Sequence, residues 1–186
     1  MKKILFIILA LLAVGVAAGL RFVSARESLA TQRAAVGSSW SAVDAALREH
    51  ADLLPTLTAR VKAPPKLEAQ ALQTITEARG VLDRAQAAPE KIQAYQRLSR
   101  ESARLLLAAE QNSGLRTDKG FLLLKEQLTG TDNRIMVARR KYNEALERYN
   151  ASLAIFPHNV VAAISGYSRD DAYFPTGLES RPFPKE

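Results

Sequence analysis

The chain has no cysteine and only two histidines among its 186 residues. Without cysteine it has no disulfide, no thiol nucleophile and no thiolate metal site. His50 and His158 stand in no Glu-x-x-His or HExxH pattern, so the ligand sets of di-iron bundles and zinc peptidases are missing. No glycine-rich phosphate loop and no nucleophile-elbow serine occurs either. We therefore expect a protein that is not an enzyme and needs no cofactor or metal.

Basic residues outnumber acidic ones by 26 to 19, but they are dispersed along the chain. Only Arg139-Arg140-Lys141 forms a tight cluster, and no basic face emerges. We expect no nucleic-acid partner. The hydrophobic content of 47% fits one domain with an appendage.

The appendage is an uncharged apolar run from Ile4 to Leu20, which follows Lys2 and Lys3. A helix of about 20 such residues is about 30 Å long and crosses the hydrocarbon core of a bilayer. The alternative is a cleaved secretory signal, because Val23-Ser24-Ala25 satisfies the small-residue rule for cleavage. The run is longer than the usual signal core and no helix breaker follows it. We predict a single-pass transmembrane anchor over residues 1–23.

The short basic start without acidic residues favours an N-terminus inside the cell. The bulk of the chain would then be periplasmic or extracellular, tethered to the cytoplasmic membrane. Gly15 and Gly19 form a GxxxG pair, the spacing that lets two membrane helices approach closely. The same spacing arises readily by chance in a segment rich in alanine and glycine. The pair is the candidate contact for a homo-oligomer.

From residue 24 the chain reads as amphipathic helices separated by prolines. Apolar residues recur at alternating steps of four and three from Val36 to Val61 and from Leu124 to Phe156, which predicts two long helices. Two shorter helices are predicted at about 66–87 and from Pro89 to Gln111. The fold class is therefore all-α, a long antiparallel four-helix bundle over residues 24–156 that follows the N-terminal transmembrane helix.

Local signals mark the ends of the C-terminal elements. Thr117 or Asp118 is placed to cap the last long helix, which Phe156-Pro157 ends. Asn159 is the candidate cap of a short apolar helix from Val160 to Ser165, which Gly166 closes. Residues 168–186 contain three prolines and predict a weakly ordered tail. Residues 157–186 thus form a third region, a short helix with a flexible tail.

Several side chains on the stripes have a structural and a functional interpretation. Trp40 is expected to anchor the bundle, and His50 to be a hydrogen-bonded bundle residue rather than a base. Tyr142-Asn143 and Tyr149-Asn150 repeat at an interval of seven, so both tyrosines share one stripe. These tyrosines either fill the bundle or recognise a partner.

The same stripes carry a family resemblance. Trp40-Ser41-Ala42-Val43-Asp44 and Asp52-Leu53-Leu54-Pro55-Thr56-Leu57 resemble the AWSxID…DLIPNL signature of the LemA family. The chain from Glu126 to Phe156-Pro157 is similar to that family's ExLxxTENRIxxARxxYN…YN…FP block. The similarity covers nearly the whole chain. It implies a single-pass bacterial membrane protein with a helical-bundle domain, and no particular activity.

The unequal helix lengths predict an incompletely covered seam. The two short helices would end near Trp40 and residue 140, which leaves an aromatic stripe of the last long helix without a cover. The short apolar helix would fold against this stripe, lie in the membrane interface or give way to a partner helix. The candidate partner-binding residues are Tyr142, Tyr149, Leu153, Phe156, Val160 and Ile164.

Two functions fit these observations. The favoured one is a non-enzymatic, membrane-anchored interaction or scaffold module of the bacterial cell envelope, whose partner is another membrane or envelope protein. The alternative is a periplasmic ligand-binding or sensor domain, tethered or secreted, with a small molecule in the bundle core. A sensor needs a polar-lined cavity, whereas these stripes consist of residues that pack closely.

Overall fold

The computed structural model describes residues 2–61 and 65–175 of the chain. Within these ranges it contains helices and no strand, so the predicted all-α class is confirmed. The elements are α1 (Lys2–Val61), α2 (Pro65–Arg84), α3 (Ala88–Glu110), the short 3₁₀ helix η1 (Leu115–Thr117), α4 (Lys119–Ser152) and α5 (His158–Ser165).

Helix α1 joins the apolar run to the first amphipathic stripe without interruption over 60 residues. No side chain in its most apolar window is buried, and the mean hydropathy there is 2.6. It is the one helix in the described ranges that is long and apolar enough to cross a membrane. The helix also continues through Pro55, although this residue has no N–H for the carbonyl of Ala51. The predicted first helix is therefore the second half of a longer one.

The boundaries of α4 and α5 differ in part from the expectation. The side chain of Asp118 accepts a hydrogen bond of 2.7 Å from the N–H of Phe121, so Asp118 is the cap of α4. Helix α4 ends at Ser152 rather than at Phe156, because the chain tightens into turns before Pro157. The expected cap of α5 is wrong, since the helix already begins at His158 and Asn159 lies inside it.

The chain divides into two compact units, and both α1 and α4 contribute to each of them. Unit 1 contains the chain up to Ser38 together with Glu144–Asp171. Unit 2 contains Ser39–Asn143 and the chain from Ala172 onward. Helices α2 and α3 therefore belong wholly to unit 2, and α5 to unit 1.

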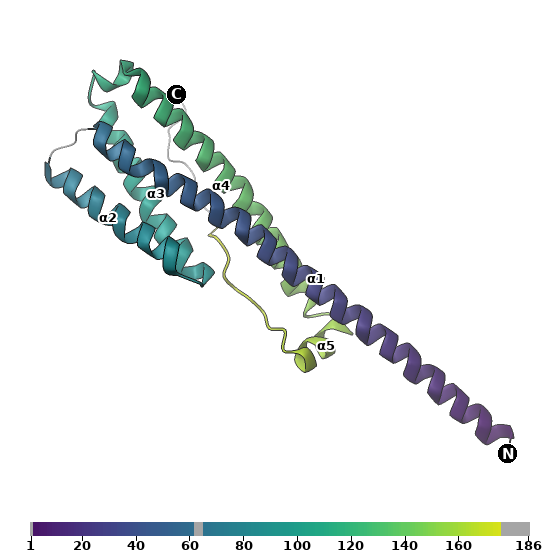
Figure 1. Ribbon diagram of the computed structural model, residues 1–186. Coiled ribbons are helices and arrows are strands. Elements are labelled where there is room, and N and C mark those ends of the chain that lie inside the picture. The colour runs from purple at the N-terminus through teal and green to yellow at the C-terminus, as the bar shows by residue number, and fades with distance from the viewer. Residues whose placement is uncertain (1, 62–64, 176–186) are drawn as a thin grey trace. The chain divides into compact units, whose positions relative to one another are not determined.

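In unit 2, α2 and α3 lie side by side, as Figure 1 shows. Side chains of the second half of α1 contact all three other helices in this unit: Arg79 of α2, Lys91 of α3 and Arg134 of α4 each pair with an acid of α1. The apolar stripes form the core, as their spacing predicts. Its largest fully buried aliphatic side chains are Leu47, Leu54, Leu57, Ile75, Leu82, Leu98, Leu105, Leu128 and Ile135.

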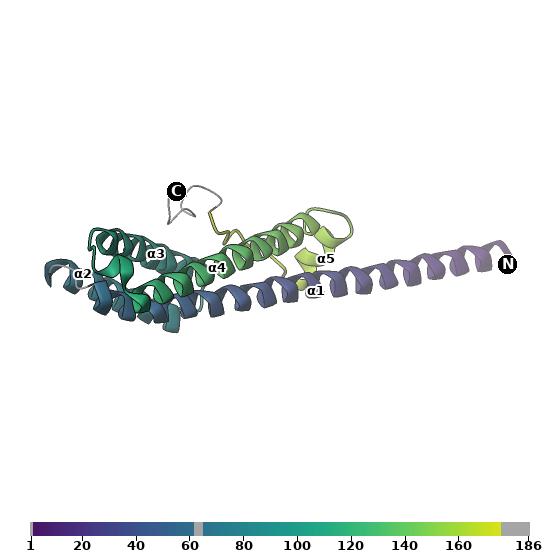
Figure 2. The ribbon, with the colours of Figure 1, turned by 90° about the horizontal axis from the view of Figure 1, so that it is seen from above.

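In unit 1, α5 packs against α1, just after the apolar run (Figure 2). Val161 and Ala162 are buried in one cluster with Ala25 and Leu29 of α1. Phe22, Leu153 and Tyr167 pack around this cluster. This cluster includes Leu153 of the predicted stripe but not its tyrosines, so the prediction that the short apolar helix folds against this stripe is met only in part.

Candidate functional site

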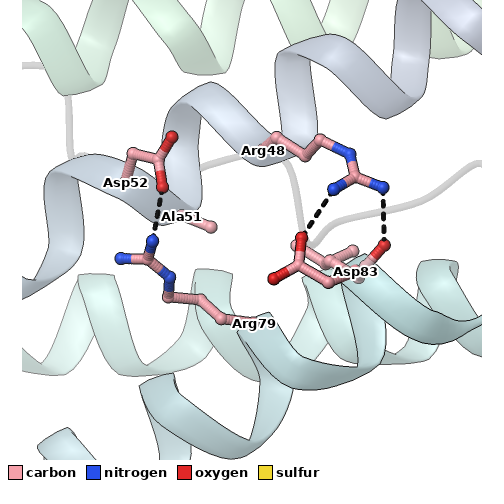
Figure 3. Close-up of a pocket in the computed structure, with 6 residues that line it drawn as sticks. Arg48, Ala51, Asp52, Arg79 and Asp83 are labelled. Carbon is pink, nitrogen blue, oxygen red and sulfur yellow. Dashed lines mark hydrogen bonds and ion pairs between the residues drawn. The ribbon is translucent and has the colours of Figure 1, made fainter.

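A polar hollow of about 100 Å³ lies between α1 and α2 in unit 2 (Figure 3). Arg48 of α1 donates to the Asp83 carboxylate at 2.5 Å, and Arg79 of α2 donates to Asp52 at 2.7 Å. Each guanidinium thus faces a carboxylate of the other helix, which neutralises both charges. These two ion pairs hold α2 against α1 and leave little uncompensated charge in the hollow for a ligand.

A more enclosed ion pair connects α1 to α3. Lys91 Nζ lies 2.6 Å from the Asp44 carboxylate, and 8% of the lysine side chain is exposed. Asp44 also accepts a hydrogen bond from Arg48. Of the arginines of α4, Arg134 pairs with Glu49 of α1, and Arg139 donates to the carbonyl of Pro175.

His50 is a buried bundle residue, as predicted. Its side chain is 1% exposed, and Nδ1 lies 3.1 Å from an Asp132 oxygen and 3.4 Å from the hydroxyl of Thr131. The ring meets Tyr95 edge to face at 5.9 Å. Burial, with a contribution from the charge of Asp132, raises the pKa of Tyr95 to about 12. No substrate reaches a group as enclosed as His50, so this cluster is structural.

A wider hollow of about 440 Å³ lies between α1 and α4 in the same unit. Of its lining residues only Thr131 is buried, so it is a surface depression rather than a core cavity. Its charged residues, Glu49 and Arg134, are paired with each other. Among the described residues, no group of three or more metal-ligating side chains is gathered in one place.

An apolar surface covers the outer side of α5 and the turn before it in unit 1. Its four residues are exposed: Ile155 60%, Phe156 77%, Val160 47% and Ile164 70%. Three of them are candidate partner-binding residues, and the fourth, Ile155, was not predicted. Val160 and Ile164 are the exposed apolar residues of α5, whose Val161 and Ala162 are buried with α1, and Ile155 and Phe156 lie in the turn before it. We call these four residues the apolar face of α5.

The predicted aromatic stripe is covered rather than exposed. Tyr142 and Tyr149 are 2% and 1% exposed, and Leu153 is partly buried. The cover is a segment that the sequence predicted to be loose. Residues 168–171 in unit 1 and residues 172–174 in unit 2 are non-helical, and a Tyr-Asn pair of α4 binds the backbone of each stretch.

In unit 1, the pair Tyr149-Asn150 binds the backbone at Ser168 and Asp170. The Tyr149 hydroxyl donates to the carbonyl of Ser168 at 3.0 Å. The Asn150 amide donates to the carbonyl of Asp170 at 2.6 Å and accepts from its N–H at 3.1 Å. Arg33 of α1 donates to the Tyr149 hydroxyl, and this hydrogen bond raises the pKa of Arg33. We call this arrangement the first clamp.

In unit 2, the pair Tyr142-Asn143 repeats the arrangement. The Tyr142 hydroxyl donates to the carbonyl of Ala172 at 3.1 Å. The Asn143 amide donates to the carbonyl of Phe174 at 2.9 Å and accepts from its N–H at 3.0 Å. We call this arrangement the second clamp. It binds the backbone through the same tyrosine and asparagine atoms as the first clamp, and its bound residues lie four positions later in the sequence.

The second clamp also holds an aromatic side chain. Phe174 is 2% exposed, with its ring 6.1 Å from Trp40 and 6.0 Å from Tyr142. The guanidinium of Arg139 lies 4.8 Å from the centre of the Phe174 ring and donates to the carbonyl of Pro175. Trp40 itself is partly buried. It therefore lines this aromatic site and is not the fully buried anchor that the sequence predicted.

Sequence reasoning missed Phe174, Arg33 and the asparagines as binding residues. The Tyr-Asn repeat at an interval of seven was the available signal, but asparagine on a helix surface gives no hint that it will face backbone. Gly15 and Gly19 are exposed, and a Cβ added at either meets nothing within 4 Å in this chain. Their role in a membrane dimer stays a prediction.

Together these features define a class of protein: an all-α protein with an exposed apolar N-terminal helix and a packed helical unit. A model of the LemA family matches residues 39–185, which is most of the chain. The chain therefore belongs to the LemA family. The match begins at Ser39, the residue at which unit 2 begins, so the apolar run lies outside it. A search of curated proteins found no match.

Proposed function

We propose that this protein is a non-enzymatic, membrane-anchored interaction module of the bacterial cell envelope. The observation that carries the proposal is the apolar part of α1. The side chains that the structure describes in this run are exposed, and it continues as one helix into residues that are buried in unit 2. An exposed run of this length costs free energy in water and is stable in a bilayer.

The surface that such a tethered module would offer is the apolar face of α5. Phe156, Val160 and Ile164 are exposed on it, and the buried face of α5 lies against Ala25 and Leu29. These α1 residues follow the apolar run by a few positions. The face would therefore stand next to the membrane, where another membrane protein can meet it.

Photo-crosslinking in cells tests this proposal. A photoreactive amino acid at Phe156 or Ile164 should capture a membrane protein, whereas one at Glu77, exposed on α2, should not. Equal capture at all three positions, or capture at none, would contradict the proposal. A crosslink to lipid alone at Phe156 and Ile164 would contradict it too, because it would make the face a second membrane contact.

A further inference from the structure

The two clamps hold a peptide by its backbone, although the peptide belongs to the same chain. In each clamp one asparagine amide both donates to and accepts from a single residue, Asp170 in the first and Phe174 in the second. A side-chain amide used in this way takes the place of a neighbouring β-strand. Such pairing needs an extended backbone and is indifferent to most side chains of the peptide.

The side chains of the bound segment agree with this interpretation. Of residues 168–175, only Phe174 is buried. Ser168, Arg169, Asp171 and Pro175 are exposed. Phe174 is therefore the one fully buried side chain among residues 168–175. A segment that buries a single apolar side chain is easier to displace than one that buries several.

We propose that the second clamp, which lies wholly in unit 2, is a receptor for extended peptide segments of other proteins, and that the chain's own residues 172–174 are its resident occupant. The fitting ligand presents an aromatic side chain to the site formed by Trp40, Tyr142 and Arg139. It also offers a free N–H at that aromatic residue to Asn143. The ligand is therefore a strand-like segment, whereas the apolar face of α5 suits a membrane-embedded partner. The inference does not rest on the proposed membrane function.

A binding assay on the detergent-solubilised full chain tests this receptor. The probe is a fluorescent synthetic peptide with the sequence of residues 167–175, capped at both ends. In Phe174→Ala the resident segment loses its anchor, so the probe should bind this variant at least about tenfold more tightly than the wild type. Trp40 is the only tryptophan, and its emission should shift as the probe's phenylalanine arrives.

Two controls distinguish recognition of the peptide backbone from nonspecific binding. A probe that is N-methylated at the residue corresponding to Phe174 cannot donate to Asn143 and should not bind Phe174→Ala. Adding Asn143→Ala to that variant should likewise abolish binding, whereas adding Asn133→Ala, an exposed asparagine of the same helix, should leave it unchanged. Equal binding by wild type and Phe174→Ala, or by the methylated and unmethylated probes, would overturn the proposal.

A measurement on the wild type covers the case in which Phe174→Ala fails to fold. Excess unlabelled probe should displace the resident residues from the second clamp and accelerate hydrogen exchange at the amide of Phe174, which bonds to Asn143. Amides in the core of unit 2, such as that of Leu128, should keep their protection. Exchange at Phe174 that does not respond to the probe at any concentration would also overturn the proposal. If the full chain instead forms dimers as the segment is released, the occupant is the segment of a second copy, and the proposal of a foreign ligand is wrong.

Discussion

At the scale of single residues, Asn143 makes two hydrogen bonds to one residue of the C-terminal segment from a partly buried position. Removing a partner of such bonds leaves backbone groups unsatisfied and costs about 1–3 kcal/mol. We expect Asn143→Ala to lower the free energy of unfolding by this amount. Asn133→Ala, exposed on the same helix, should change it by less than about 0.5 kcal/mol. Denaturation followed by Trp40 fluorescence measures both, and equal effects would contradict the clamp.

Tyr95 gives a prediction for alkaline pH. Its pKa is about 12 in the folded chain and about 10 in an unfolded one, so the folded state keeps its proton longer. Between pH 10 and 12 ionisation of the tyrosine lowers the free energy of the unfolded state relative to the folded state, so stability falls with rising pH. The loss is about 2–3 kcal/mol across this window, and Tyr95 causes none of it below pH 10.

The variant Tyr95→Phe isolates this effect, because it has no group to ionise at this position. Its free energy of unfolding should fall less than that of the wild type between pH 10 and 12, as measured by chemical denaturation at fixed pH values. Parallel curves for the two proteins would show that burial does not hold the Tyr95 proton.

The role of a residue could be predicted where the helical period of the apolar residues determines whether it is buried. It was harder to predict where the residue contacts a segment that is distant in sequence. The period of the first stripe placed His50 in the core, and it is there. Trp40 occupies the same stripe but is only partly buried. Its partners include Phe174, which lies 134 positions away in sequence and carries no periodic signal. The sequence left open whether Tyr142 and Tyr149 fill the bundle or recognise a partner for the same reason, since their hydroxyls bond to residues that lie later in the chain.

At the scale of elements, Gly166 ends α5 in the left-handed conformation with φ 75°, as the sequence predicted. A Cβ at this position meets nothing within 4 Å, so the cost of Gly166→Ala is the backbone conformation alone, about 1 kcal/mol. The N–H of Tyr167, which bonds the carbonyl of Ala162, should exchange about fivefold faster in this variant.

The matched control for Gly166 is Gly130, in the interior of α4, where an added Cβ also meets nothing within 4 Å. Gly130→Ala should stabilise α4 by about 0.5–1 kcal/mol, because alanine is the better helix former. Hydrogen exchange measures both variants. Faster exchange in α4 of Gly130→Ala, or unchanged exchange at Tyr167 in Gly166→Ala, would contradict this account of the two glycines.

The spacing of apolar residues and the positions of proline and glycine predicted which helices exist. Where each helix ends depends on local contacts, which the sequence shows less clearly. The α2 and α3 helices begin within one residue of their predicted starts, because prolines mark these starts, whereas α2 ends at Arg84, three residues before its predicted end. The end of α4 was placed four residues too late, since the stripe continues to Phe156 while the helix does not. The extended segment after Gly166 has no period, and only its partners on α4 define it.

At the scale of the whole chain, unit 2 takes α1 only from Ser39 and α4 only as far as Asn143. From the helix lengths, the sequence predicted that α2 and α3 end near Trp40 and residue 140, but it treated residues 24–156 as a single domain. The family match begins at the same serine. Helices α1 and α4 therefore both extend beyond unit 2, and the apolar run lies at the N-terminal end of α1.

The anchor is the central claim of the proposed function, and the mass of the membrane-bound protein after alkaline carbonate extraction tests it most directly. Carbonate removes peripheral proteins, so a chain that stays in the pellet is held by an apolar span. We expect the pellet to contain the intact chain of 20.4 kDa, including residues 1–23. A species that begins near Arg26 and is found in the soluble fraction would show a cleaved signal sequence and contradict the membrane-anchored account.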